Sequence, residues 1–266
     1  AGGMQINLLV DLILASLLPV GAISWLYYAD RLAQLPLGVV GIALGTALLP
    51  RLSAAEADDK RDKFVKALDD ALIFAGFFIV PAMISLIILS GPIIEGLFVY
   101  GVFTTDDAVM AAMALSAYAL GLPGFVLVKI LQSAFYAAGQ PGTVLKISIM
   151  TVLINITGSL VMMPLLGHVG LALATSFSGL IAGVLMAALL YRRRRLGGAW
   201  LCMMGRILLA TSVMAIFIFL LTNFGTGLQR NLPAALWLIG LVISGGVVFF
   251  ASAVFFRAIP ADLLRR

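Results

Sequence analysis

Two adjacent charged residues, Asp30-Arg31, interrupt the apolar run Ile23-Ser24-Trp25-Leu26-Tyr27-Tyr28-Ala29-Asp30-Arg31-Leu32. A charged side chain at membrane depth is costly to retain, so it is by default a candidate contact for substrate, ion or water. Arginine carries a planar fork of donors that can hold a phosphate or a carboxylate through two hydrogen bonds. The alternative is an internal Asp–Arg ion pair that fixes one helix to another. The residues alone leave both interpretations open.

Other polar residues within apolar runs offer oxygen atoms. Asn155 and Ser159 are four residues apart and therefore share one helix face. With Asp11 and Thr175, which lie in other runs, they would form a small oxygen cage for a hard cation. They would equally serve as hydrogen bonds between helices. Lys129 lies about two turns from the expected cytoplasmic end of its run, where it would either reach the membrane surface or line a cavity.

The composition excludes a soluble protein. The chain has 266 residues, of which 62% are hydrophobic and only 11% charged, whereas a soluble domain has about 25% charged residues. The single cysteine, Cys202, excludes a disulfide framework and a cysteine metal site, and the single histidine, His168, argues against a histidine cluster. Neither a Gly-rich phosphate loop after a strand nor a serine–histidine–acid set can be assembled, so we expect no enzyme.

Eight apolar runs, each near the ~20 residues that cross a bilayer, predict an all-α polytopic membrane protein with about eight transmembrane helices. The runs cover approximately residues 4–20, 22–50, 67–90, 107–138, 143–164, 168–191, 201–222 and 233–256. The short segment 90–101 is expected at the outer membrane interface. Residues 56–66 are expected to form a solvated, partly helical loop, with Asp69 solvated nearby.

The basic residues are distributed unevenly between the two sides of this arrangement. Alternate loops place fourteen of the seventeen Lys and Arg residues on one side and only Arg230 on the other. The positive-inside rule then predicts that both ends of the chain face the cytoplasm. The net charge of +5 is explained by this asymmetry, so we expect no nucleic-acid partner. The run Arg192–Arg195 is interpreted as an anchor for anionic lipid headgroups.

The chain resembles the MurJ (MviN) lipid II flippases, within the superfamily of multidrug and polysaccharide-lipid exporters. The resemblance rests on Ser24–Leu32, on Pro36–Pro50 with its Gly38, Gly41 and Gly45, on Leu89–Ile93 with Leu97–Thr104, and on Val128–Leu131 with Phe135-Tyr136. These motifs cover the first half of the chain. Beyond about Thr143 the similarity is mainly in the number and length of the spans.

The resemblance implies an architecture larger than this chain. Members of the family have about fourteen spans in two six-helix lobes, followed by two further helices. We therefore expect residues 1–195 to form the second six-helix lobe, and residues 196–266 to form two helices lining a groove for a polyprenyl tail. The chain opens with Ala1-Gly2-Gly3, which agrees with a fragment that lacks the N-terminal lobe.

The resemblance also implies site residues. Arg31 corresponds to a cavity arginine that binds the lipid-linked diphosphate, and we group Asp30 and Lys129 with it as substrate-binding residues. Asp11, Asn155 and Thr175 match a sodium site of some members, whereas Ser159 stands where a second acid is expected. Coupling to sodium ions or to protons is therefore expected.

The function implied is translocation of lipid II, the undecaprenyl-diphosphate-linked peptidoglycan precursor, across the bacterial inner membrane by alternating access. Its expected partners are lipid II, membrane lipids and the missing lobe.

A related exporter of polysaccharide lipids or drugs is the alternative, although Asp30-Arg31 favours a diphosphate ligand. A membrane-embedded prenyl-phosphate enzyme would need acids or histidines gathered at one membrane face, which this sequence lacks. A non-transporting scaffold for cell-wall synthesis is a further alternative.

Overall fold

The computed structural model describes residues 2–45, 48–58, 60–193, 195–224 and 234–259. Across these residues every regular element is an α-helix. The helices are α1 (Gly2–Ala15), α2 (Ala22–Gly45), α3 (Leu48–Ala57), α4 (Arg61–Ile88), α5 (Ser90–Phe98), α6 (Thr105–Ala137), α7 (Pro141–Leu166), α8 (His168–Arg192), α9 (Ala199–Phe224) and α11 (Ala234–Phe255). The predicted all-α membrane architecture is therefore confirmed.

Six of the described helices are long and apolar enough to cross a membrane. These are α4, α6, α7, α8, α9 and residues Leu236–Phe255 of α11. The other two predicted spans correspond to α1, which has 14 residues, and α2, which carries Asp30 and Arg31 in its interior. The predicted number of eight spans is therefore approximate.

The second apolar run is shorter than predicted. Instead of one helix over residues 22–50, α2 ends at Gly45 and a separate short helix, α3, begins at Leu48. Pro50 in the first turn of α3 explains the new start, because proline lacks the N–H that a continuous helix would require there. Leu48, Leu52 and Ala55 form the buried face of α3.

Of three shorter predictions, the one for 56–66 is confirmed, the one for Asp69 is wrong, and the one for 90–101 is confirmed only in that the segment is too short to cross. Segment 90–101 contains the 9-residue helix α5, which is too short to cross a membrane. The solvated loop at 56–66 is partly helical, since α3 ends and α4 begins within it. Asp69, in contrast, is buried at 6% exposure rather than solvated. The connection from α8 to α9 covers it, and its carboxylate accepts hydrogen bonds from the backbone N–H groups of Gly197 and Ala199.

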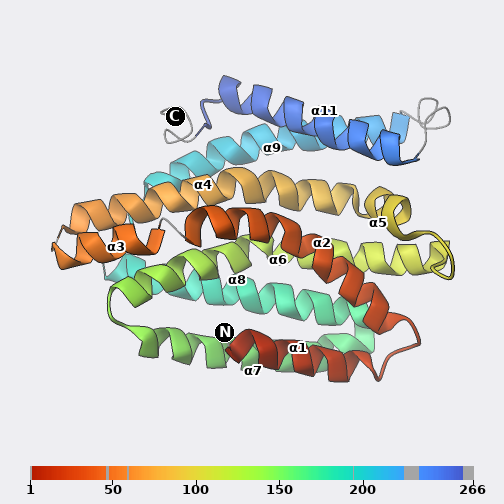
Figure 1. The fold of residues 1–266 in the computed structure, drawn as a ribbon, viewed down its shortest axis with the longest axis horizontal. Coiled ribbons are helices and arrows are strands. Elements are labelled where there is room, and N and C mark those ends of the chain that lie inside the picture. Colours follow the sequence, from red (N-terminus) through yellow and green to blue (C-terminus); the bar gives the residue numbers. More distant parts are fainter. Residues whose placement is uncertain (1, 46–47, 59, 194, 225–233, 260–266) are drawn as a thin grey trace.

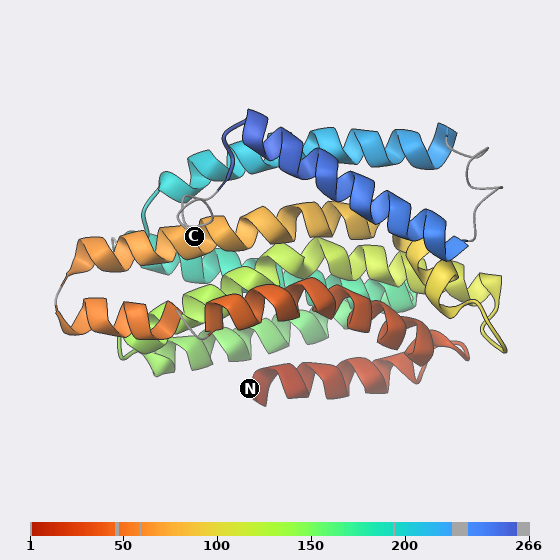
Figure 2. The same ribbon diagram turned by 45° about the horizontal axis from the view of Figure 1, so that its top comes forward.

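The helices lie roughly side by side along the longest axis of the molecule (Figure 1). Helix α6 is central and packs against α2, α4 and α8, while α7 packs on the other side of α8. Helices α6 and α8 approach closely at Gly124, where a Cβ atom would lie 2.5 Å from the backbone nitrogen of Leu180. Helices α9 and α11 pack on α4, on the opposite side of the bundle from α1 and α7 (Figure 2).

The start of α6 shows how the sequence fixes a helix end. Thr104 accepts a hydrogen bond from the backbone N–H of Asp107 at 3.2 Å, and the Asp107 carboxylate accepts one from the backbone N–H of Thr104 at 2.9 Å. This reciprocal capping box satisfies two amide groups that would otherwise lack partners. Asp107 also accepts a hydrogen bond from Trp25 Nε1 at 2.8 Å, which fixes the start of α2 against α6.

The turn between α6 and α7, the connection from α8 to α9, and α3 lie at one end of the bundle (Figure 1). The α1–α2 turn, α5 and the α7–α8 turn lie at the other end. Most described basic residues belong to the first end, as the uneven loop charges require. Arg194, Arg230, Arg265 and Arg266, which also entered the charge count, lie outside the described residues.

Candidate functional site

A cavity of about 370 Å³ lies between α1, α2, α6, α7 and α8. Its polar lining includes Asp11, Asp30, Gln34, Lys129, Thr151 and Thr175. Four of these side chains were predicted as site residues from the sequence. Two carboxylates and one ammonium group therefore share a single cavity whose remaining lining is mostly apolar, and charged groups at membrane depth are candidate contacts for a ligand or an ion.

Arg31 does not line this cavity but lies next to it on the exposed face of α2. Its guanidinium carbon is 4.9 Å from the centroid of the Tyr27 ring, within the range of a cation–π contact. No ion pair joins Arg31 to Asp30 in the described structure. Asp30 instead accepts a hydrogen bond from Gln34 Nε2 at 2.5 Å. Asp30 and Arg31 therefore make separate side-chain contacts in the described structure, and only a charge interaction without an ion pair connects them.

Lys129 lies in the wall between two cavities. Besides the first cavity it lines a second one of about 420 Å³, between α2 and α6, whose other walls are mostly apolar. A Cβ atom on Gly41 would lie 3.6 Å from the Lys129 ammonium nitrogen, so the lysine lies across the glycine face of α2. Of the two positions considered for Lys129, the structure shows cavity lining.

A chain of polar contacts connects α1, α7 and α8 beside the first cavity. Thr175 Oγ1 lies 3.0 Å from Asp11 Oδ2 and 3.1 Å from the carbonyl oxygen of Leu171, and donates to one of them. Asn155 Nδ2 donates to Thr175 Oγ1 at 2.9 Å. Asn155 and Ser159 are both fully buried on one face of α7. The four residues predicted to share a site are thus on facing helices.

Several oxygen atoms in this group have no hydrogen-bond partner. Asp11 Oδ1, Asn155 Oδ1 and Ser159 Oγ are buried without a donor in the described structure. Buried oxygens of this kind are rare in native proteins, because each loses its hydration without compensation. A carboxylate, an amide and hydroxyl oxygens are the ligands that hard cations prefer. The donor set therefore fits a small hard cation.

The described residues contain no group of three or more His, Cys, Asp and Glu side chains that would hold a metal ion. His168 is buried and has a structural role, because its Nε2 lies 2.9 Å from the carbonyl oxygen of Met110 and its ring contacts Trp25 edge-on.

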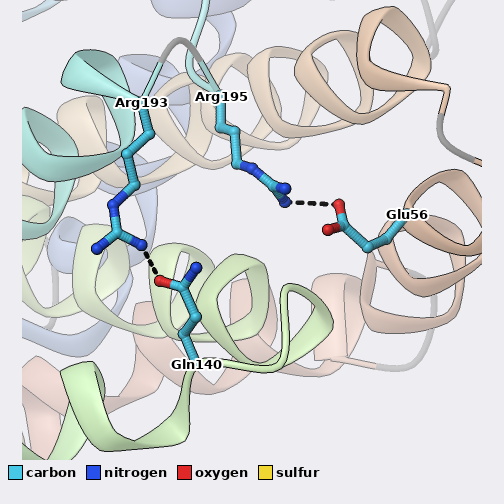
Figure 3. A network of polar contacts seen from close by, with 4 residues as sticks. All are labelled: Glu56, Gln140, Arg193 and Arg195. Atoms are coloured by element: carbon cyan, nitrogen blue, oxygen red, sulfur yellow. Dashed lines mark hydrogen bonds and ion pairs between the residues drawn. The ribbon is translucent and has the colours of Figure 1, made fainter.

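The arginines at the end of α8 and after it make more contacts within the protein than the sequence suggested. Arg195 forms an ion pair with Glu56 of α3, and Arg193 donates to Gln140 in the α6–α7 turn (Figure 3). The Arg195 guanidinium also lies 5.4 Å from the centroid of the Phe64 ring. These two arginines therefore bind protein groups rather than serving only as lipid anchors. Sequence reasoning missed these pairs, because nothing local connects residues 56 and 195.

Gln34 and Thr151 also line the first cavity and were not singled out from the sequence. Gln34 carries a usable signal, since it lies four residues after Asp30 and therefore on the same side of the helix. Thr151 carries a weaker signal: it is four residues before Asn155, but its hydroxyl donates to the Ile147 carbonyl at 2.8 Å, as many membrane-helix threonines do.

Comparison with known proteins gives a consistent result. The sequence model of the family "Lipid II flippase MurJ" matches residues 1–256. A protein of Vibrio cholerae named "Probable lipid II flippase MurJ" is 40% identical over 196 residues, which cover 74% of this chain and 37% of the relative. A protein of Rickettsia prowazekii with the same name is 34% identical over 260 residues, which cover 96% of this chain and 50% of the relative.

Among solved structures, "Lipid II flippase MurJ, inward closed conformation" is similar to this fold with a TM-score of 0.80 and 30% sequence identity. The match covers 98% of this chain and 52% of that structure. The chain thus spans about half the length of the relatives it matches, or less.

Proposed function

Because this chain belongs to the lipid II flippase MurJ family, we propose that it forms the second lobe of a transporter for lipid II. In this proposal an N-terminal lobe completes a central cavity, and residues 196–266 supply two further helices. The transported molecule is the undecaprenyl-diphosphate-linked peptidoglycan precursor, which moves from the inner to the outer leaflet of the bacterial cytoplasmic membrane. We assign the chain no catalytic step and no nucleic-acid partner.

One observation carries this proposal: the exposed guanidinium of Arg31 beside a cavity that holds Asp11, Asp30 and Lys129 in an apolar bundle. It forms no ion pair with the adjacent Asp30 in the described structure, since Asp30 accepts a hydrogen bond from Gln34, although the two charges still attract each other. A guanidinium fork matches the oxygen geometry of a diphosphate, where it can form two parallel hydrogen bonds. Lys129, in the wall of the same cavity, adds a second positive charge. Asp30 would orient neighbouring donors on the headgroup.

The mechanism follows from keeping two parts of one lipid in two different environments. The diphosphate and its sugars enter the cavity between the lobes while the polyprenyl tail stays in hydrocarbon. The apolar pair α9 and α11, with many exposed large hydrophobic residues, supports a groove for that tail. Rocking of one lobe against the other then exposes the headgroup to the opposite side. A membrane potential can bias this step, since one charge crossing 100 mV corresponds to about 2.3 kcal/mol.

An ion gradient is a second way to bias the rocking of one lobe against the other. We assign Asp11, Asn155, Ser159 and Thr175 as the residues that would hold a sodium ion, supported by their three partnerless oxygens. A bound cation would supply positive charge to the Asp11 carboxylate and connect α1 to α7 and α8. A proton taken up by Asp11 would serve the same purpose. The positive-inside rule supports an orientation with α3 and both chain ends in the cytoplasm.

Complementation tests the proposed substrate. The intact protein should restore growth and cell shape to bacteria depleted of their own lipid II flippase. Arg31→Ala should be present in the membrane at normal levels and fail to complement, because no other described side chain replaces its fork on that face of α2. A protein that does not complement, but exports polysaccharide lipids or cationic drugs, would belong to the related exporters. Full complementation by Arg31→Ala would contradict the role assigned to this arginine.

A further inference from the structure

Asp30 and Arg31 follow one another on α2, yet their side chains take part in separate contacts in opposite directions along the helix. The Asp30 carboxylate accepts from Gln34, one turn toward the C-terminus, at 2.5 Å. The Arg31 guanidinium lies 4.9 Å from the ring centroid of Tyr27, one turn toward the N-terminus. Both contacts join residues four apart, which are neighbours on a helix surface.

These two contacts keep a pair of opposite charges from forming an ion pair, although the charges still attract each other electrostatically. Asp30 is half-buried in the cavity wall while Arg31 lies outside the cavity on the exposed face of α2, so their attraction is stronger than that between two fully hydrated charges. Consecutive helix residues diverge by about 100°, but both side chains are long enough to lean toward each other. Contact between them would use the donors of Arg31 and neutralise its charge before any ligand arrived.

The contact partners of Asp30 and Arg31, which are Gln34 and Tyr27, are uncharged, so neither contact cancels the charge that it holds in place. Gln34 satisfies a carboxylate oxygen of Asp30 without bringing a positive charge. The face of the Tyr27 ring attracts the guanidinium through its quadrupole, while the N–H donors at the edge of the guanidinium plane remain available. Tyr27 and Arg31 are both exposed on this face of α2, so these donors are accessible.

We propose that Tyr27 and Gln34 are positioning residues that hold Asp30 and Arg31 apart, so that the guanidinium stays available to an anionic group such as a diphosphate. The identity of that group rests on the proposed function. The separation of the two charges does not, and it can be measured without any lipid substrate.

The first experiment measures how fast phenylglyoxal, which reacts with free guanidinium groups, modifies Arg31 in the intact protein in lipid nanodiscs, with mass spectrometry as readout. Gln34→Ala should slow modification of Arg31 about fivefold, the factor that roughly 1 kcal/mol of new ion pairing corresponds to. Tyr27→Ala should slow it similarly, whereas Tyr27→Phe keeps the ring face and should react at the original rate.

The decisive comparison adds a second substitution. In Asp30→Asn/Gln34→Ala and in Asp30→Asn/Tyr27→Ala no carboxylate remains to capture the arginine, so the original rate should return. A purely structural effect of either substitution would not be reversed in this way. Tyr136→Ala, which removes another half-exposed tyrosine on α6, is the matched control and should leave the rate unchanged. An unchanged rate in Gln34→Ala, or no recovery on removing the Asp30 charge, would overturn the proposal.

A second measurement separates this inference from the proposed function. Inorganic pyrophosphate should protect Arg31 of the original protein from phenylglyoxal, and should protect it less in Gln34→Ala. If pyrophosphate gives no protection while the variants still change the modification rate as described, the separation of charges stands and the diphosphate ligand is wrong. If protection is seen but is equal in all variants, Tyr27 and Gln34 do not position the arginine.

Discussion

Two features concern single residues in unusual surroundings: the partnerless oxygens on α1 and α7, and the Arg31 guanidinium on α2, which forms no ion pair in the described structure. A helix period placed residues 155 and 159 on one face, and the resemblance to the flippase family added Asp11 and Thr175 to the expected ion site. The sequence could not predict which atoms lack partners, since that depends on how three helices meet. It likewise left open whether Asp30 pairs with Arg31, because the answer lies in their contacts with Gln34 and Tyr27.

The buried oxygens lead to a prediction about sodium. Sodium chloride, compared with choline chloride at equal ionic strength, should raise the thermal unfolding temperature of the intact protein, because a cation bound only to the folded state stabilises it. At one hundred times its dissociation constant the ion would contribute about 2.7 kcal/mol. Asn155→Ala should remove this response. Thr157→Ala, an exposed position on the same helix, should retain it. A sodium response that survives in Asn155→Ala would place the ion elsewhere.

At the scale of elements, the connection from α8 to α9 is held by contacts distant in sequence. Arg195 contacts Glu56 and Phe64, and the Asp69 carboxylate accepts backbone N–H groups at the start of α9. The sequence predicted every long helix, because each apolar run is continuous over the required length. It missed the break between α2 and α3, since Leu48 and Leu49 continue the apolar run and only Pro50 indicates a new helix.

The hydrogen bonds accepted by the Asp69 carboxylate should contribute measurably to the free energy of unfolding. Asp69→Ala removes the acceptor for Gly197 and Ala199 from a buried position, as the loss of a helix N-cap does, and should lower the free energy of unfolding by about 1–2 kcal/mol. Asp69→Asn keeps an acceptor oxygen and should lose clearly less. Chemical unfolding in detergent micelles, followed by tryptophan fluorescence, measures both variants. Equal decreases in the free energy of unfolding for Asp69→Asn and Asp69→Ala would show that the charge of Asp69, and not its hydrogen bonding, stabilises the fold.

At the scale of the whole molecule, the two ends of the bundle carry different chemistry. Described basic residues gather at the end with α3, whereas α5 and the loop before α6 lie at the other. The charge pattern of the loops predicted this arrangement from the sequence, because topology is set by short loops next to spans. The cavity between helices could not be predicted in the same way, since its shape depends on packing across the whole lobe.

The orientation can be tested by labelling single cysteines in intact cells, starting from the intact protein made cysteine-free, with Cys202, the one cysteine of this chain, replaced by Ser. Val102→Cys, 97% exposed in the loop between α5 and α6, should react with a membrane-impermeant maleimide. Ser53→Cys, exposed on α3, should react only after the cells are permeabilised. The reverse pattern would show that the positive-inside rule does not hold for this chain and that the proposed direction of transport is wrong.

The most direct measurement is translocation of lipid II by the purified intact protein in proteoliposomes. The original protein should move labelled lipid II between leaflets, and Arg192→Ala, an exposed arginine outside the cavity, should do the same. Arg31→Ala should lower the translocation rate to that of empty liposomes, and Arg31→Lys should recover only part of it, because lysine lacks the fork. Translocation at the original rate by Arg31→Ala would contradict the role of this guanidinium in binding the diphosphate.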